Sequence, residues 1–328
     1  MLDPKDIHLT GERTYTRPLF GVRFDPLGRF VVTGSQGNSV QRWNLADEKL
    51  VELQAHDSWV RAISHTHDGS TFFTGGYDGR IAKWNSESIE AKPVQLIQAH
   101  DGWLRSLDVS PDGSLIVSGG NDNLVKIWKA EDLSLIKTIE GHPRHVYRVR
   151  FHPDGKRVVS VGLMGEIFSW EVESGKQLQK YDGSTLHKFD NTFKADIGGS
   201  RSLDFSADGN HFACGGFTNV SNAFAGVGDA LALIFDVDKE KPHQKLQPKA
   251  KFKGEGWGLR YHPDGFIIVC FSGGGGGKLC FFKGDTENEF FEFKLPTQCF
   301  DLDLSHDGKQ LAIAGSDKKL RFYSLEKK

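Results

Sequence analysis

Short apolar segments of strand length alternate with polar turns along the whole chain. The turns share a glycine, usually as Asp-Gly, which recurs seven times, at Gly28, Gly69, Gly113, Gly155, Gly209, Gly265 and Gly308. Glycine accepts the positive φ of a tight turn, so Asp-Gly between β-rich segments indicates a hairpin. Two apolar runs follow each turn, for example residues 114–119 and 124–128. The pattern predicts a chain of repeated β-hairpins.

An aromatic residue marks the same position in most of these repeats. It stands 15 residues after the turn glycine in five of them, as Trp43, Trp84, Trp128, Trp170 and Tyr323. Phe235 takes this place in the fifth repeat after an insertion, and Cys280 or Phe281 takes it in the sixth. The successive turn glycines are 41, 44, 42, 54, 56 and 43 residues apart. A period of this length indicates a repeat architecture.

A His preceded by a small residue opens three of the repeats, in the pairs Ala55-His56, Ala99-His100 and Gly141-His142. Together with the Trp, this pattern resembles the WD repeat, and the resemblance covers essentially residues 1–328. It implies a single all-β domain, a seven-bladed β-propeller with four-stranded antiparallel blades. In this family the outermost strand of one blade opens the next repeat, so the last blade lacks a strand. We expect residues 7–16 to supply that strand and close the ring.

The polar residues within a repeat invite comparison with a catalytic triad, but the resemblance implies a structural hydrogen-bonded tetrad. The implied tetrads are His56, Thr74, Asp78 and Trp84 in the second repeat and His100, Ser118, Asp122 and Trp128 in the third. A buried Trp N–H needs such an acceptor. Met164 in the fourth repeat and Gly37 in the first replace the tetrad Asp. We expect the hydrogen-bonded tetrad to stabilise these two blades less, because each missing hydrogen bond is worth about 1 kcal/mol.

Family structures expose three side chains per blade on one rim. Counting from the turn glycine of each repeat gives the equivalent positions in this chain. The resemblance then implies partner-binding residues at Phe20, Trp59, Arg61, Tyr77, Trp103, Arg105, Tyr147, Arg201, Trp257 and Phe300. Aromatic residues and Arg dominate interface hot spots. The alternative is that Trp59 and Trp103 pack the channel rim without any ligand.

Two insertions interrupt the repeat, at residues 182–197 and 217–229, and residues 273–277 form a run of five glycines. By strand order all three emerge on the predicted binding rim, over blades 4–6, and long ordered loops tend to be functional. The glycine run could cradle an anion, but a flexible hairpin tip fits it better because no phosphate-binding signature follows. The inserted acidic and His residues could form a cation or catalytic cluster, although nothing in their spacing requires one: His187, Asp190, Asp196 and Asp229.

Composition and charge narrow the classes of partner. The chain has 41 basic and 43 acidic residues, which is not the basic footprint of a nucleic-acid binder. No apolar run is long enough to cross a bilayer. The four cysteines lack C-x-x-C spacing and lie in apolar stretches, so we expect buried inert thiols at Cys214, Cys270, Cys280 and Cys299. His65 and His67 have no third ligand in view, so we expect neither a metal nor a cofactor.

The combined pattern predicts a protein-interaction scaffold and not an enzyme. We expect a cytoplasmic monomer, with a removed signal peptide left open, that binds a peptide or partner protein on the rim and channel mouth. The rim arginines would favour an acidic segment through charge-assisted hydrogen bonds. Two alternatives remain: an enzyme with an active site in the blade 4–6 loops, and a purely structural domain of a larger assembly.

Overall fold

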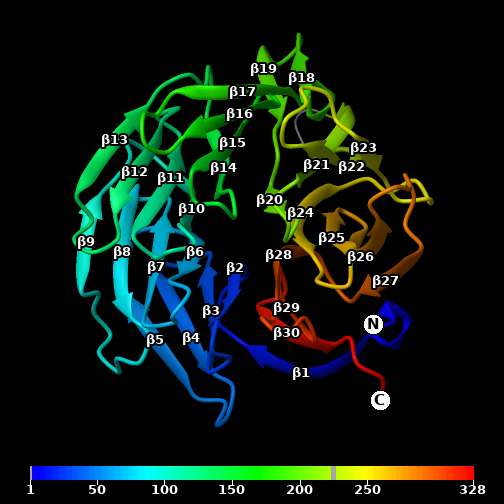
Figure 1. Cartoon of the computed structure of the whole chain (residues 1–328). Helices are drawn as coiled ribbons and strands as arrows, with labels where there is room; N and C mark the ends of the chain where they lie inside the picture. Colours follow the sequence, from blue (N-terminus) through cyan, green and yellow to red (C-terminus); the bar gives the residue numbers. More distant parts are fainter. Residues whose placement is uncertain (1, 223–226) are drawn as a thin grey trace.

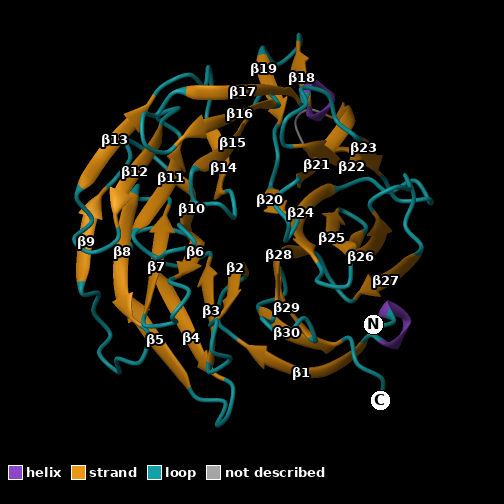
Figure 2. Cartoon of the chain, viewed as in Figure 1, coloured by secondary structure: helices purple, strands orange, loops and turns teal. Residues whose placement is uncertain are grey.

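The computed structural model describes residues 2–222 and 227–328, and it forms a ring of seven four-stranded antiparallel sheets (Figure 1). The predicted seven-bladed all-β propeller is confirmed. Apart from strands, the described residues form two short 3₁₀ helices, η1 (Pro4–Asp6) and η2 (Ser184–Leu186) (Figure 2). No helix in this described part is long and apolar enough to span a membrane.

Blades 1 to 4 are each built from four consecutive strands, which run in order from the innermost to the outermost. Blade 1 contains β2 (Leu19–Phe24), β3 (Phe30–Ser35), β4 (Ser39–Asn44) and β5 (Leu50–Gln54). Blade 2 contains β6 (Val60–His65), β7 (Thr71–Gly76), β8 (Arg80–Asn85) and β9 (Gln95–Gln98). Blade 3 contains β10 (Leu104–Val109), β11 (Leu115–Gly120), β12 (Val125–Lys129) and β13 (Leu135–Ile139). Blade 4 contains β14 (Val146–Phe151), β15 (Arg157–Gly162), β16 (Glu166–Glu171) and β17 (Gln177–Asp182).

Blades 5 to 7 follow the same order, with one hairpin inserted before blade 5. That hairpin pairs β18 (His187–Asp190) with β19 (Ala195–Gly198). Blade 5 contains β20 (Ser202–Phe205), β21 (His211–Asn222), β22 (Val227–Asp236) and β23 (Gln244–Leu246). Blade 6 contains β24 (Glu255–Tyr261), β25 (Phe266–Gly273), β26 (Gly276–Lys283) and β27 (Phe291–Leu295). Blade 7 contains β28 (Cys299–Leu304), β29 (Gln310–Gly315), β30 (Lys319–Ser324) and β1 (His8–Thr14).

The turn glycines and the N-terminal strand behave as the repeat predicts. All seven turn glycines have φ between 67° and 88°, which explains the choice of residue. The N-terminal strand β1 pairs antiparallel with β30 and completes the last blade, so both chain ends lie beside blade 7 (Figure 1). Glu12 reinforces this closure, because its carboxylate lies 2.7 Å from both Lys319 Nζ and Arg321 Nε.

In blades 2 and 3 the tetrad residues meet in a hydrogen-bonded chain that runs across the blade. In blade 3, Trp128 Nε1 donates to Ser118 Oγ at 2.8 Å, and the Ser118 hydroxyl lies 2.7 Å from His100 Nε2. His100 Nδ1 then donates to Asp122 at 2.8 Å. The same contacts join Trp84, Thr74, His56 and Asp78 in blade 2. Every member is buried or half-buried, so the chain satisfies polar groups that would otherwise be unpaired.

In blade 4 another acid replaces the tetrad Asp, so the expectation of a missing bond is wrong for that blade. In blade 4 the carboxylate of Glu166 lies 3.2 Å from His142 Nδ1, two residues beyond Met164. The longer Glu side chain reaches back to the His from the next strand. In blade 1, Trp43 Nε1 donates to Thr33, whose hydroxyl donates to Gln41 at 3.1 Å, and Gln41 takes the place of the His.

We therefore expect Glu166→Ala to destabilise the protein by about 1 kcal/mol, as much as Asp122→Ala does in blade 3. The substitution removes the acceptor of a nearly buried His N–H. The free energy of unfolding in urea measures both effects. A Glu166→Ala variant as stable as the parent, beside a weakened Asp122→Ala variant, would show that blade 4 is held without this bond.

A belt of ionic contacts joins the lower parts of the innermost strands. Arg150 of blade 4 lies between Asp108 of blade 3, at 3.5 Å, and Asp204 of blade 5, at 2.9 Å. Arg260 of blade 6 pairs with Asp303 of blade 7 at 2.8 Å. The carboxylates also accept backbone N–H groups of a neighbouring blade, as Asp108 does from Phe151. The belt therefore connects neighbouring blades, whose strands are not hydrogen-bonded to one another.

His65 lies near this belt, at the end of β6, and neither of its ring nitrogens has a hydrogen-bond partner among the described residues. Burial lowers its pKa to about 4 from the usual 6.5.

Because the pKa of His65 is lowered in the folded protein, the unfolded chain binds a proton more readily than the folded protein between pH 6.5 and about 4. We expect the free energy of unfolding to fall as the pH decreases from 6.5 towards about 4. Urea titrations across this range should show a smaller decrease for His65→Gln, and an equal decrease in both proteins would exclude His65 as its source.

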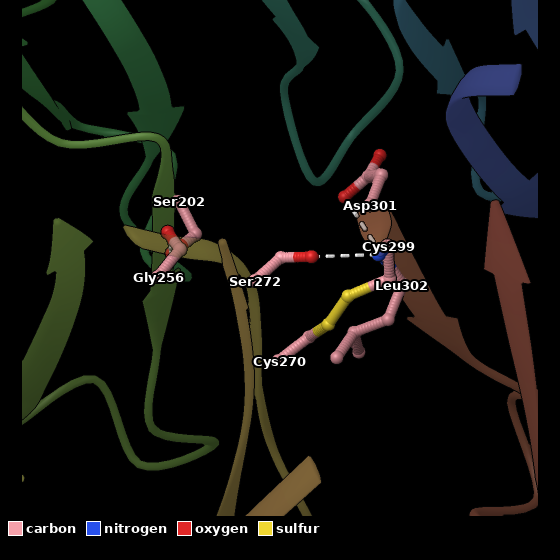
Figure 3. The surroundings of a disulfide bond; sticks show 7 residues. All are labelled: Ser202, Gly256, Cys270, Ser272, Cys299, Asp301 and Leu302. Atoms are coloured by element: carbon pink, nitrogen blue, oxygen red, sulfur yellow. Dashed lines mark hydrogen bonds between the residues drawn. A yellow bond between two sulfur atoms is a disulfide. The ribbon is translucent and has the colours of Figure 1, made fainter. Parts of the chain in front are cut away.

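The cysteines differ in part from the expectation of four inert thiols. Cys270 of β25 and Cys299 of β28 form a disulfide that links blade 6 to blade 7 (Figure 3). The backbone N–H of Cys299 also donates to Ser272 Oγ at 2.8 Å. The expectation is therefore wrong for this pair, which lie 29 residues apart and meet only through the packing of two blades. Cys214 and Cys280 are free and buried, and burial raises the pKa of the Cys214 thiol to about 12.

Candidate binding cup at the channel mouth

A β-bulge begins the innermost strand of six blades, and it determines which side chains reach the channel mouth. The register of each inner strand skips one residue near its start, and the skipped residues are Phe20, Arg61, Arg105, Tyr147, Trp257 and Phe300. In blade 5, Arg201 takes this position, since its N–H donates to the carbonyl of Gly215, which also pairs with Ser202. A bulged residue is left out of the ladder, which bends the strand and re-aims the side chain. These seven residues form one ring around the channel mouth.

Three aromatic residues stand above this ring, on blades 2 and 3. The N–H of Tyr77 donates to the carbonyl of Trp59 at 2.8 Å, and the N–H of Asn121 donates to that of Trp103 at 2.9 Å. These bonds hold each Trp beside the residue that precedes the tetrad Asp of the same blade. Trp59 and Trp103 remain 42% and 43% exposed. The alternative, in which both Trp side chains only pack the rim, therefore explains the buried part of each side chain and not the exposed part.

The aromatic members of the rim form a continuous arc. Trp103 stacks on Tyr77 with centroids 4.4 Å apart, and Tyr77 contacts Trp59 at 5.9 Å. Trp59 stacks on Phe20 at 5.4 Å, and Phe20 stacks on Phe300 at 4.6 Å. The arc ends where Trp257 meets Phe300 edge-on at 5.3 Å. Such contacts fix ring orientations, because aromatic pairs prefer stacked and edge-to-face geometries.

Two arginines and Tyr147 close the arc into a circuit. Tyr147 lies between two guanidinium groups, at 4.2 Å from Arg105 and 4.4 Å from Arg201. Arg105 reaches back to Trp103 at 5.1 Å, and Arg201 reaches Trp257 at 5.8 Å. The guanidinium group of Arg61 lies 4.9 Å from the Trp257 ring and 5.8 Å from the Phe20 ring. All ten predicted rim residues thus belong to one connected set, which we call the cup.

The charge of the cup is positive. Arg201 pairs with Glu255 at 2.8 Å, whereas Arg61 and Arg105 have no carboxylate partner among the described residues. Burial lowers the pKa of Arg105, and repulsion from Arg201 and Arg61 adds to this effect. Burial alone would raise the pKa of Tyr77, but Arg61 and Arg105 outweigh it, and the net pKa is lowered. The cup therefore carries a net positive charge.

A pocket of about 420 Å³ adjoins the cup and shares two of its residues, Trp257 and Phe300. Its other walls include Gln298 and the glycines at 273–275. The glycine run forms a tight hairpin between β25 and β26, with Gly273 opposite Gly276, as a hairpin tip requires. The sequence columns did not reveal this pocket, because it lies between two blades.

The two longer insertions lie beside each other without forming a cation cluster. Lys188 Nζ of the β18–β19 hairpin donates to the carbonyl of Val220 in the second insertion, whose residues 223–226 lie outside the described residues. His187 pairs with Asp196 at 3.0 Å, while Asp229 pairs with Lys253 at 2.8 Å. Asp190 accepts N–H groups of its own turn. Within the described residues no three His, Cys, Asp or Glu side chains are arranged to hold a metal.

Comparison with known proteins agrees with this geometry. The family model "WD domain, G-beta repeat" matches residues 8–44, 47–85, 91–129 and 133–165. These stretches cover the first four sequence repeats, from β1 to β15, and the later blades have the same strand order.

The chain is a seven-bladed β-propeller whose first four repeats are WD repeats.

Curated relatives of this WD-repeat propeller match it over short stretches. The small ribosomal subunit protein RACK1y of Oryza sativa subsp. japonica is 39% identical over 67 residues, which is 20% of either chain. The DDB1- and CUL4-associated factor 13 of Danio rerio is 33% identical over 72 residues, 20% of this chain and 16% of the relative. The propeller is thus matched to a fifth or less of each relative's length.

Proposed function

We propose that this WD-repeat propeller is a protein-interaction scaffold that binds a peptide or a loop of a partner protein in the cup. The observation that carries the proposal is the connected set of ten aromatic and Arg side chains, two of whose tryptophans are more than two-fifths exposed. Exposed Trp beside Arg is costly to keep on a surface that binds nothing, and it is the composition of an interface hot spot.

The expected partner segment is acidic. Arg61 and Arg105 offer guanidinium groups that no carboxylate of the described chain neutralises, and the aromatic walls lower the local dielectric constant. A carboxylate entering the cup would gain charge-assisted hydrogen bonds and lose little water. The neighbouring pocket beside Trp257 could take an apolar side chain of the same segment.

The names of the relatives are consistent with a scaffold. One is named as a protein of the small ribosomal subunit and another as a factor associated with DDB1 and CUL4. By analogy we propose a binding role and no catalytic one. A monomer in the cytoplasm stays part of the proposal, although the Cys270–Cys299 disulfide counts against a reducing compartment.

A pull-down from the native organism tests the proposal. The bait is the whole propeller, compared with the double variant Arg105→Glu/Trp257→Ala. A matched control, Lys129→Glu/Ile136→Ala, alters a groove between blades 2 and 3 outside the cup. We expect the cup variant to lose a partner that the parent and the control both retain, by roughly tenfold or more in recovered amount. Identical partner lists from all three baits would refute the cup as the binding site.

The two alternatives predict other outcomes of the same experiment. A purely structural domain would keep its neighbours in the cup variant, because they would contact other faces. An enzyme centred on the blade 4–6 loops would tolerate the cup substitutions and lose activity with His187→Ala or Asp196→Ala. Neither alternative has, among the described residues, a connected set of side chains comparable to the cup.

A further inference from the structure

The charged side chains of the seven innermost strands lie at two levels of the channel. Below the bulge ring four arginines are matched by four aspartates: Arg23, Arg148, Arg150 and Arg260, with Asp108, Asp204, Asp301 and Asp303. At the level of the cup, Arg61, Arg105 and Arg201 stand against a single carboxylate, that of Glu255. Three arginines against one carboxylate leave two positive charges unmatched among the described residues of these strands. Both unmatched charges therefore belong to the cup.

The three guanidinium groups of the cup lie close together, because they share aromatic rings. Arg61 and Arg201 both lie against Trp257, with guanidinium-to-centroid distances of 4.9 Å and 5.8 Å. Arg105 and Arg201 both lie against Tyr147, at 4.2 Å and 4.4 Å. The shared rings bring the three positive charges to one region of the channel mouth.

Two of these guanidinium groups have incomplete hydrogen bonding or only a neutral partner. Nη2 of Arg61 is buried and has no hydrogen-bond partner among the described residues. Its neighbours are the ring faces of Trp257 and Phe20, which offer no oxygen acceptor. Arg105 Nε donates to Asn121 Oδ1 at 2.5 Å, and this neutral amide leaves the charge of Arg105 uncompensated. Buried donors of a charged group favour an acceptor that also carries negative charge.

The number of unmatched charges selects the chemistry of that acceptor. A carboxylate side chain carries one negative charge, and so does each phosphodiester of a nucleic acid or phospholipid. A phosphomonoester on a protein side chain carries a charge of about −1.5 to −2 at neutral pH and has three acceptor oxygens. It therefore neutralises both unmatched arginines, and it accepts hydrogen bonds from two guanidinium groups at once.

We propose that the cup recognises a phosphorylated side chain of its partner protein, with the phosphate bound by Arg61 and Arg105. This inference rests on the proposed function, since it takes the ligand to be a segment of the partner. It replaces the general acidity of that segment with one modified residue. Binding would then depend on whether the partner is phosphorylated.

Two capped amino acids test the choice of anion. N-acetyl-phosphoserine amide and N-acetyl-aspartate amide differ only in the anionic group of the side chain, and tryptophan fluorescence of the whole chain reports their binding. Trp59, Trp103 and Trp257 belong to the cup, whereas the other four tryptophans are at most 5% exposed: Trp43, Trp84, Trp128 and Trp170. We expect the phosphoserine derivative to change the emission saturably, with a Kd at least about tenfold below that of the aspartate derivative. An aspartate derivative that binds equally well, or no saturable change with either probe, would overturn the proposal.

Single substitutions test the position of the phosphate. We expect Arg61→Met and Arg105→Met each to weaken binding of the phosphoserine derivative by about tenfold or more. The control Arg144→Met replaces an arginine whose side chain is 58% exposed, and it should bind like the parent. Parent-like binding by both cup variants would show that these arginines do not hold the phosphate. The comparison of the two probes on the parent decides the choice of anion even if Arg61→Met does not fold.

A pull-down from phosphatase-treated lysate separates this inference from the proposed function. We expect treatment to remove the same partner that the Arg105→Glu/Trp257→Ala bait fails to recover. A partner that survives phosphatase treatment but is lost with this bait would overturn the phosphate inference and leave the cup as the binding site. A partner recovered by this bait as well as by the parent would instead refute the proposed function itself.

Discussion

Removing residues 1–16 should lower the melting temperature of the propeller by roughly 10 °C or more, the largest stability effect we expect. The deletion strips β1 from β30 and leaves the edge of blade 7 unpaired. It also removes the Glu12 contacts with Lys319 and Arg321. Finally, it removes two buried side chains, Ile7 from the blade 7 core and Tyr15 from the core between blades 1 and 7.

Differential scanning calorimetry measures the change, and light scattering should detect self-association through the opened edge. A chain lacking only Lys327 and Lys328, which are exposed at the other terminus, is the matched control and should melt like the parent. If the chain without residues 1–16 melted at the parent temperature, blade 7 would be stable as a three-stranded sheet, and ring closure would not contribute to stability.

Asp303→Ala should cost about 3–5 kcal/mol of unfolding free energy, the largest effect expected from a single substitution. The Asp303 carboxylate accepts Arg260 Nε at 2.8 Å and the backbone N–H of Phe24 in blade 1 at 2.8 Å. Its loss leaves the buried Arg260 without a paired charge and breaks a contact between the first and last blades. Urea denaturation measures the difference.

The double variant Asp303→Ala/Arg260→Met separates the two contributions. We expect it to regain much of the lost stability, because the penalty of Asp303→Ala comes mainly from an orphaned buried charge. Glu326→Ala, which breaks an exposed pair with Lys309, should change stability by about 1 kcal/mol at most. A double variant no more stable than Asp303→Ala would instead assign the loss to the backbone contact with Phe24.

The disulfide joins the two blades that carry Trp257 and Phe300 of the cup. Cys299 directly precedes Phe300, and Cys270 lies on the strand that leads to the glycine hairpin beside the pocket. The covalent link between blades 6 and 7 therefore supports one wall of both the cup and the pocket. A rigid wall loses less conformational entropy when a partner binds.

The sequence by itself determined the number of blades, the ring closure and the identity of the rim residues. The reason is local: the turn glycine, the aromatic mark and the strand lengths repeat at nearly constant spacing, and a constant spacing places equivalent residues at equivalent heights. The transferred positions of Phe20, Arg61 and Trp257 coincide with the bulge of each inner strand for this reason.

Only the tertiary structure decided what these residues contact. Cys270 and Cys299, like Glu166 and His142, come from different strands or blades, and no periodic pattern relates them. Whether a charge is neutralised depends on distances across the channel, and those distances exist only once the ring is closed.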